Sequence, residues 1–254
     1  RAVAAVAGEG WQVIMSDLNS VIVPGLTNWE ASNRFFAYFK PHSSYPAVMG
    51  ELVCAGLNVM GFDWIASPAA TELEVVTCDW LCKLLRLPSR FLHSSSGPGG
   101  GVFQDSAGSS ATVVLLAALK RAEAAAASRT RSTVVRRSDM VVYASDQTHT
   151  IVKKACIILG VGTYRELPTS AADNWGLQAE TLRAAIVEDL AAGRYPVACV
   201  ATAGTTSSCA FDDIAGLATV CAQTESPCGP LWLHIDAAYV SRGVVLPRLC
   251  HCRC

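Results

Sequence analysis

The sequence predicts an α/β protein in which helices cover both faces of a mostly parallel sheet. Three short apolar runs with β-branched residues, at 140–144, 197–201 and 231–235, are typical of buried strands. Helical patterns separate these runs, and this alternation is typical of a parallel sheet that is covered on both sides. A chain of 254 residues is also long enough to bury a sizeable core.

Apolar spacing and end signals predict four helices. The first spans 71–87, with Thr71 as its cap and Pro88 after its end. The other three are expected at 109–127, 148–159 and 178–192. No internal repeat is visible.

Composition excludes several classes of function. The net charge of −1 argues against non-specific electrostatic binding of nucleic acid. No window supplies about 18 uninterrupted apolar residues, so no membrane span is expected. The first residues lack the layout of a signal peptide and contain no initiator Met, which indicates a chain that begins within a longer protein, with the cytoplasm as its default location.

The 11 cysteines do not predict a disulfide scaffold. Six of them lie singly in apolar segments, where free thiols behave as small buried hydrophobes: Cys54, Cys78, Cys82, Cys156, Cys199 and Cys221. The chain ends in LCHCRC, whose spacing fits no common zinc pattern, and no metal site is expected there.

Polar residues follow the three predicted strands. Ligands of open α/β sheets bind outside the carboxyl ends of the strands, which here carry residues 145–149, 202–206 and 236–239. His149, Asp236 and a hydroxyl-rich turn should therefore converge at one edge, with Asp236 largely buried. Taken singly, Asp236 reads as a helix cap and His149 as an ordinary residue at a helix start. A serine hydrolase is not indicated, because the G-x-S-x-G elbow is absent.

A glycine-rich stretch at 97–101 leads through small and hydroxyl residues into the helix at 109–127. Such a helix start favours an anion, because its backbone N–H groups and dipole both attract negative charge. A phosphate cradle, a ring that can stack and a buried carboxylate together suit pyridoxal 5'-phosphate (PLP).

Seven runs extend this interpretation over most of the chain from about Pro24 to Tyr239. They are FFAYFKPHSSYPAVMGELV at 35–53, GFDWIASPAATELE at 61–74, DWLCKLL at 79–85, GGGVFQ at 99–104, YASDQTHTIVKKA at 143–155, ATAGTTSSCAFD at 201–212 and LWLHIDAAY at 231–239. Together they resemble the group II PLP decarboxylases, above all the aromatic-L-amino-acid branch. The resemblance implies the aspartate-aminotransferase-like fold (fold type I), PLP as cofactor, and conversion of an aromatic L-amino acid to its amine and CO2.

The resemblance also implies roles for individual residues. Asp236 would pair with the pyridine nitrogen, His149 would stack on the ring, Ala238 would pack on the other face and Thr206 would help to organise the pocket. The phosphate turn would consist of Ser106, Ala107, Gly108 and Ser109.

The substrate pocket would contain Tyr38 and Phe39, while Phe62 would reach the site of the neighbouring subunit of a homodimer. Asp105 and the extra residue in the phosphate turn depart from the family pattern, and which serine binds the phosphate stays open. Lys40, followed by Pro41, also departs from the family pattern.

The resemblance places the lysine that binds PLP beyond the HIDAAY run, whereas the last lysine here is Lys154. The expected organisation is therefore a partial N-terminal segment at 1–45, an incomplete PLP-binding domain at 46–240 and an atypical Cys-rich tail at 241–254. A catalytically inactive truncated paralogue or fragment is the alternative to an active parent enzyme. Histidine or glutamate decarboxylase and aromatic aldehyde synthase are further alternatives.

Overall fold

The computed structural model describes residues 8–35, 43–129 and 135–239, and divides into two compact units, 1–56 and 57–254. The first unit is helical where it is described. Its elements are α1 (Trp11–Asp17), the π-helical η1 (Leu18–Ile22), α2 (Val23–Gly25), the 3₁₀ turn η2 (Trp29–Ala31) and α3 (Tyr45–Leu57). None of these elements has a buried residue among those described.

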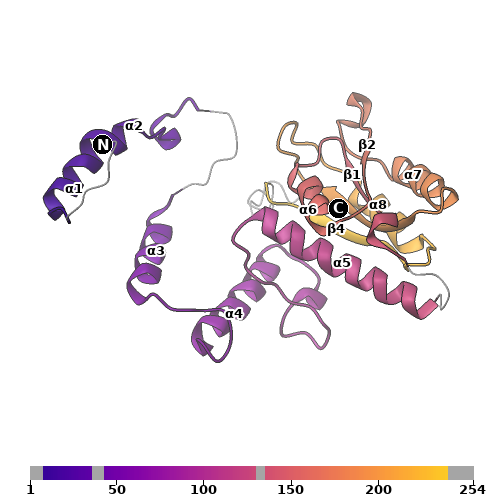
Figure 1. Cartoon of the computed structure of the whole chain (residues 1–254), viewed down its shortest axis with the longest axis horizontal. Helices are drawn as coiled ribbons and strands as arrows, with labels where there is room; N and C mark the ends of the chain where they lie inside the picture. The colour runs from indigo at the N-terminus through magenta and orange to yellow at the C-terminus, as the bar shows by residue number, and fades with distance from the viewer. Residues whose placement is uncertain (1–7, 36–42, 130–134, 240–254) are drawn as a thin grey trace. The chain divides into compact units, whose positions relative to one another are not determined.

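The second unit is built on a four-stranded parallel sheet in the order β2-β1-β3-β4 (Figure 1). Three strands confirm the sequence prediction: β1 (Met140–Ser145), β3 (Tyr195–Thr202) and β4 (Trp232–Asp236). The strand β2 (Thr163–Leu167) was not predicted. Its TYREL sequence includes the charged residues Arg165 and Glu166, and it lies at the edge of the sheet, where strands need not be apolar.

Helices pack on both faces of the sheet, as predicted. One face carries α5 (Ala107–Arg129) and α6 (Ile151–Leu159), and the other carries α7 (Ala179–Ala191) and α8 (Ile214–Gln223). Leu119 and Leu182, one from each side, are fully buried. Alternate residues of β1 enter the two cores, since Val142 faces α5 and α6 while Tyr143 faces α7 and α8.

The helix ends differ from the sequence prediction in physically simple ways. The first predicted helix is α4 (Pro68–Leu84), which begins before Thr71 because Pro68 fits the first helical turn. Thr71 is therefore not the cap, and its hydroxyl donates within the helix to the Ser67 carbonyl at 3.1 Å. Helix α6 begins at Ile151 rather than at Thr148. Helix α8, which was not predicted, is capped by Asp213 through the Gly216 N–H.

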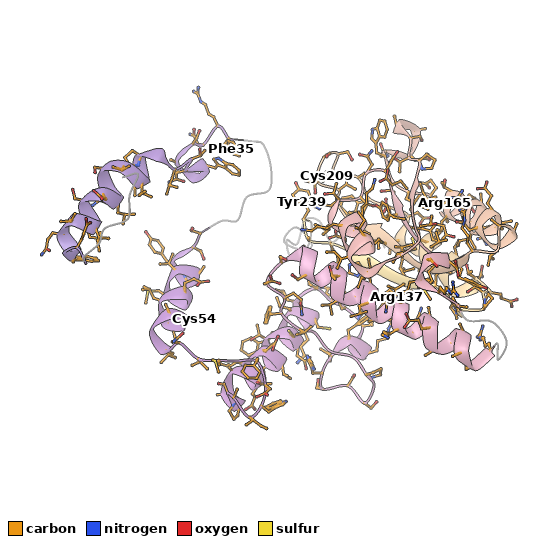
Figure 2. All side chains as sticks on the ribbon, in the orientation of Figure 1. Phe35, Cys54, Arg137, Arg165, Cys209 and Tyr239 are labelled. Carbon is orange, nitrogen blue, oxygen red and sulfur yellow. The ribbon has the colours of Figure 1, made fainter. Side chains whose placement is uncertain are left out.

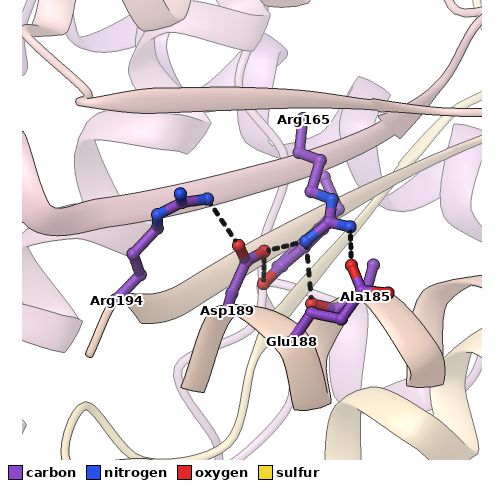
Figure 3. Close-up of polar contacts among 6 residues, drawn as sticks. Arg165, Ala185, Glu188, Asp189 and Arg194 are labelled. Atoms are coloured by element: carbon purple, nitrogen blue, oxygen red, sulfur yellow. Dashed lines mark hydrogen bonds and ion pairs between the residues drawn. The ribbon is translucent and has the colours of Figure 1, made fainter. Parts of the chain in front are cut away.

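A buried charge cluster joins the sheet to α7 (Figure 3). Asp189 is 1% exposed and accepts hydrogen bonds from the Tyr143 hydroxyl at 2.8 Å and from Arg194 Nη1 at 2.8 Å. Arg165 on β2 reaches the same carboxylate at 2.9 Å and also binds the exposed Glu188. Burial raises the pKa of Tyr143 well above its ordinary value, and the hydrogen bond to Asp189 adds to the shift. Every member of this cluster that is fully buried has a partner.

The cysteines follow the prediction in part. Cys82, Cys156, Cys199 and Cys221 are buried, and burial raises the pKa of Cys156 to about 12. Cys54 was expected to be buried but is exposed on α3, because none of the described residues of the first unit buries it. The tail with Cys250, Cys252 and Cys254 lies outside the described residues. No helix within residues 8–35, 43–129 and 135–239 is long and apolar enough to cross a membrane.

Candidate functional site

The carboxyl ends of the three predicted strands meet at one edge of the sheet. Thr202 at the end of β3 is in register with Asp236 at the end of β4, and Ala144 of β1 is in register with Val200 of β3. The Ala203 N–H donates to the Asp236 carbonyl at 2.8 Å. The structure thus brings together the three strand ends that the sequence indicated.

Side-chain hydrogen bonds tie the loop after β1 to the turn after β3. The Thr148 hydroxyl accepts from the Ser145 N–H at 3.1 Å and lies 3.4 Å from the Thr202 hydroxyl. One residue earlier, Gln147 Oε1 accepts from the Ser208 hydroxyl at 3.2 Å. These bonds hold the loop that carries His149 against the turn that carries Thr206.

The imidazole of His149 is held by the start of α6. Its Nδ1 accepts from the Ile151 N–H at 3.2 Å, so in the neutral ring the proton lies on Nε2. The residue is exposed, and its ring face is therefore accessible to a ligand at the strand ends. A histidine that is anchored through one nitrogen and open on its face suits stacking on an aromatic ring.

The carboxylate of Asp236 ends β4 and is half-buried, whereas the sequence predicted a largely buried group. The difference arises because β4 is the outer strand of the described sheet and one of its edges is not covered by another described strand. Oδ1 accepts from the Ala238 N–H at 3.1 Å. Within the part of the chain that the structure describes, no group binds Oδ2, which leaves it able to accept from a ligand.

Two adjacent threonines in the turn after β3 have different environments. Thr205 is 1% exposed, and its hydroxyl accepts from the Ala210 N–H at 3.0 Å and lies 2.8 Å from the Ser208 hydroxyl. Thr206 is exposed, and its hydroxyl has no hydrogen bond to another described residue. Of the two, Thr206 is the residue whose hydroxyl is available to a ligand.

The predicted phosphate turn forms the start of α5. Ser106 caps the helix, since its hydroxyl accepts from the Ser109 N–H at 3.2 Å, and the two hydroxyl oxygens lie 3.1 Å apart. The first N–H groups of the helix, at Ala107 and Gly108, have no acceptor within the helix. A Cβ at Gly108 would lie 3.8 Å from Ile151, which places this helix start beside the residue that anchors His149.

These groups fit pyridoxal phosphate on the chemistry of their donors and acceptors. Two serine hydroxyls and free helix N–H groups suit a phosphate, and an available carboxylate oxygen suits a ring N–H. Ala238 is exposed next to Asp236, as a small residue that packs on a ring would be. Phe62 lies outside this cluster, with 74% of its side chain exposed before α4. Tyr38 and Phe39 lie outside the described residues.

Asp212 supports the turn and was not identified from the sequence. It is 5% exposed and accepts from the Thr202 N–H at 2.7 Å and from the Leu177 N–H at 2.8 Å. Burial raises its pKa, although both N–H bonds oppose the shift. Its only sequence signal is its position ten residues after Thr202, which by itself predicts no contact.

The turn after β3 also contacts the residues after β4. Cys209, which adopts a positive φ of 55°, lies beside Tyr239 (Figure 2). Burial and the neighbouring Cys209 thiol raise the pKa of Tyr239. This contact joins the turn after β3 to the residues that follow Asp236.

The chain is similar to known proteins over nearly all of its length. Residues 2–252 match the pyridoxal-dependent decarboxylase conserved domain. The chain is 45% identical over 242 residues to 3,4-dihydroxyphenylacetaldehyde synthase of Drosophila melanogaster, covering 94% of this chain and 45% of that protein. It is 41% identical to aromatic-L-amino-acid decarboxylase of Cavia porcellus, covering 96% of this chain and 49% of that protein.

A solved structure shows the same fold. The crystal structure of Oryza sativa TDC with PLP and tryptamine matches with a TM-score of 0.88 and 38% identity, covering 99% of this chain and 50% of that one. The fold-type-I architecture predicted from the sequence is thereby confirmed. The chain spans about half the length of the curated relatives that it matches.

Proposed function

Because this chain belongs to the pyridoxal-dependent decarboxylase family, we propose that the whole protein converts an aromatic L-amino acid to its amine and CO2. The observation that carries the proposal is the convergence of Asp236, the His149 loop and Thr206 at the carboxyl ends of three parallel strands. The start of α5 lies beside the same loop and offers hydroxyl and N–H donors to a phosphate. The family's cofactor, pyridoxal phosphate, needs these same groups.

Each residue of the cluster has a proposed task. When bound, pyridoxal phosphate supplies an electron sink for the bond that breaks at the amino-acid α-carbon. The Asp236 carboxylate would hold a proton on the ring nitrogen, because an adjacent negative charge stabilises the protonated form. His149 would cover one face of the ring and Ala238 the other, while Thr206 would donate a hydrogen bond at the edge of the pocket.

The phosphate would bind at the start of α5. Ser106, Ala107, Gly108 and Ser109 offer hydroxyl and N–H donors there, and the helix dipole favours an anion. Asp105 is exposed immediately before this turn, so its charge is screened by solvent. These donors would hold the cofactor at one end, while Asp236 would hold it at the other.

An aromatic substrate is proposed from the resemblance and from the relatives, whose names refer to aromatic compounds. Tyr38, Phe39 and Phe62 are the proposed contacts of its side chain. Production of an aldehyde is a second candidate, because the chain is 45% identical to a 3,4-dihydroxyphenylacetaldehyde synthase.

A homodimer is part of the proposal. Helix α4 carries an exposed apolar stripe at helical spacing, formed by Leu73, Val76, Trp80 and Leu84. A stripe of this kind is typical of a surface that another chain covers. Light scattering on the purified protein would test the dimer. Cell fractionation would test the proposed cytoplasmic location. Limited proteolysis would test the proposed domain boundaries, which divide the chain into 1–45, 46–240 and 241–254.

The test is a product assay on the full protein supplied with pyridoxal phosphate. L-tyrosine, L-tryptophan, L-histidine and L-glutamate are supplied separately, and amines and aldehydes are identified by mass spectrometry. We expect an aromatic amine or aldehyde, together with CO2. Asp236→Ala should abolish the product, whereas Asp173→Ala, an exposed aspartate on the turn η5 (Ala171–Asp173), should not. Products from glutamate alone, or no product at all, would overturn the proposal.

A further inference from the structure

The segment that leads into the phosphate turn is a glycine-rich loop without regular structure, residues 97–103. Its consecutive glycines 99–101 lie so close to neighbouring residues that a side chain there would have no room. A Cβ at Gly99 would lie 1.8 Å from the Arg90 carbonyl oxygen, and one at Gly101 would lie 3.0 Å from Cys78 on α4. Three consecutive glycines leave the backbone free to adopt many conformations, so other residues must hold this one.

Asp79 on α4 holds the chain just before this loop. It is 8% exposed, and its Oδ1 accepts from the His93 N–H at 2.7 Å. Its Oδ2 accepts from the N–H of Ser94 at 3.3 Å and from the hydroxyl of Ser94 at 2.9 Å. Burial would raise the pKa of Asp79, but these hydrogen bonds outweigh it and lower the pKa, which keeps the carboxylate ionised.

Two further contacts hold the end of the loop, one from the His93 ring and one from Glu74. The His93 ring nitrogen Nε2 lies 3.0 Å from the Gly101 nitrogen and 2.6 Å from its carbonyl oxygen. Glu74, also on α4, accepts from the Phe103 N–H at 2.7 Å. Three residues after Phe103, Ser106 caps α5. Helix α4 thus sets the position of the backbone on both sides of the glycines and directly before the phosphate turn.

We propose that Glu74 and Asp79 are positioning residues that fix the glycine-rich loop, and thereby aim the Ser106–Ser109 turn at the cofactor phosphate. This inference rests on the proposed function, because it assumes a phosphate at that turn. Neither carboxylate touches the ligand. Glu74 acts through Phe103 and Asp79 acts through His93, and the loss of either should weaken phosphate binding while the core that holds α5 stays intact.

Glu74 offers the sharper test, because it is half-buried and its removal leaves the core untouched. The ligand is pyridoxamine 5'-phosphate, which requires no lysine bond, and its dissociation constant is measured by calorimetry on the full protein. Glu74→Ala should weaken binding roughly tenfold, because a displaced turn would lose about one hydrogen bond to the charged phosphate. Glu74→Gln should restore binding, since its amide oxygen can still accept from Phe103.

Two controls separate positioning from charge and from folding. Glu72→Ala removes a similar charge from the exposed side of α4 and should leave binding unchanged. In a Ser109→Ala background, Glu74→Ala should have little further effect, because both changes act on the same turn. Thermal unfolding without ligand should stay cooperative for both variants, with Glu74→Ala lower only by the few degrees that one lost hydrogen bond costs. Asp79→Asn provides a second variant. Both oxygens of Asp79 accept hydrogen bonds, and the amide nitrogen of Asn cannot accept from the Ser94 N–H, so a loss of binding is expected here too.

The outcomes are distinguishable. If the wild-type protein does not bind pyridoxamine 5'-phosphate, the proposed function fails and this inference fails with it. If the wild type binds pyridoxamine 5'-phosphate but Glu74→Ala has the same dissociation constant as Glu72→Ala, the positioning role alone is refuted. Additive effects of Glu74→Ala and Ser109→Ala would likewise refute it, because the two residues would then act independently.

Discussion

Removal of the buried carboxylate by Asp189→Ala should destabilise the second unit severely. Asp189 is 1% exposed and joins three groups from different elements: the Tyr143 hydroxyl on β1, Arg165 on β2 and Arg194 before β3. Without the carboxylate, the Tyr143 hydroxyl stays buried without its acceptor. Arg194 loses its ion-pair partner, and Arg165 keeps only the exposed Glu188 (Figure 3).

The expected loss of unfolding free energy follows from the burial of Asp189. Breaking a buried pair by removing one partner costs about 3–5 kcal/mol. The arginine side chains are 26% and 46% exposed and can be rehydrated in part, so the lower end, about 3 kcal/mol, is expected. For a unit of this size, about 1 kcal/mol shifts the midpoint of thermal unfolding by about 2–4 °C, so the expected decrease in Tm is about 6–12 °C.

The assay is urea unfolding followed by circular dichroism, with Glu188→Gln as the matched control. Glu188 binds the same Arg165, but its side chain is 67% exposed, and exposed ion pairs contribute roughly 0–1 kcal/mol. We expect burial of the ion pair, rather than pairing as such, to determine the loss of stability. This expectation would be refuted if Asp189→Ala lowered the free energy of unfolding no more than Glu188→Gln does.

Three smaller predictions follow from other parts of the second unit. Glu123→Gln should lower the free energy of unfolding by less than about 1 kcal/mol at neutral pH. The hydrogen bond from Arg137 lowers the pKa of Glu123, so this difference in stability should vanish as the pH falls through that pKa. Urea denaturation at several pH values would show it. Gly162→Ala should destabilise by about 1–3 kcal/mol, since the new Cβ would lie 1.7 Å from the Ser138 carbonyl oxygen; an unchanged urea midpoint would contradict it. Leu119→Ala, at a fully buried position, should cost about 2–5 kcal/mol in the same assay.

The core of the fold was predictable because its signals are local and strong. The strands β1, β3 and β4 are apolar and bounded by turns, and α7 begins and ends within one residue of its predicted span. The strand β2 was missed because its polar residues satisfy tertiary partners: Arg165 binds Asp189 from α7, and Lys153 of α6 binds Glu166 at 2.9 Å. Such partners are not visible in a five-residue window.

The candidate site was predictable where chemistry follows a strand end. His149, Thr206 and Asp236 were predicted to lie at one edge because parallel strands present their carboxyl ends together, and the strand pairing confirms that placement, while their roles stay predictions. The supporting residues were not found. Asp212 bonds to backbone groups at 177 and 202, and Asp79 to residues 14 and 15 positions later. No sequence motif encodes a side chain that binds distant backbone.

The central claim is that the strand ends and the start of α5 form one cofactor site. A crystal structure of the full protein with pyridoxal phosphate tests it most directly. We expect the phosphate at Ser106–Ser109, the ring nitrogen within hydrogen-bond distance of Asp236, and the ring between His149 and Ala238. A cofactor bound elsewhere, or one whose ring nitrogen faces a residue other than Asp236, would contradict the account.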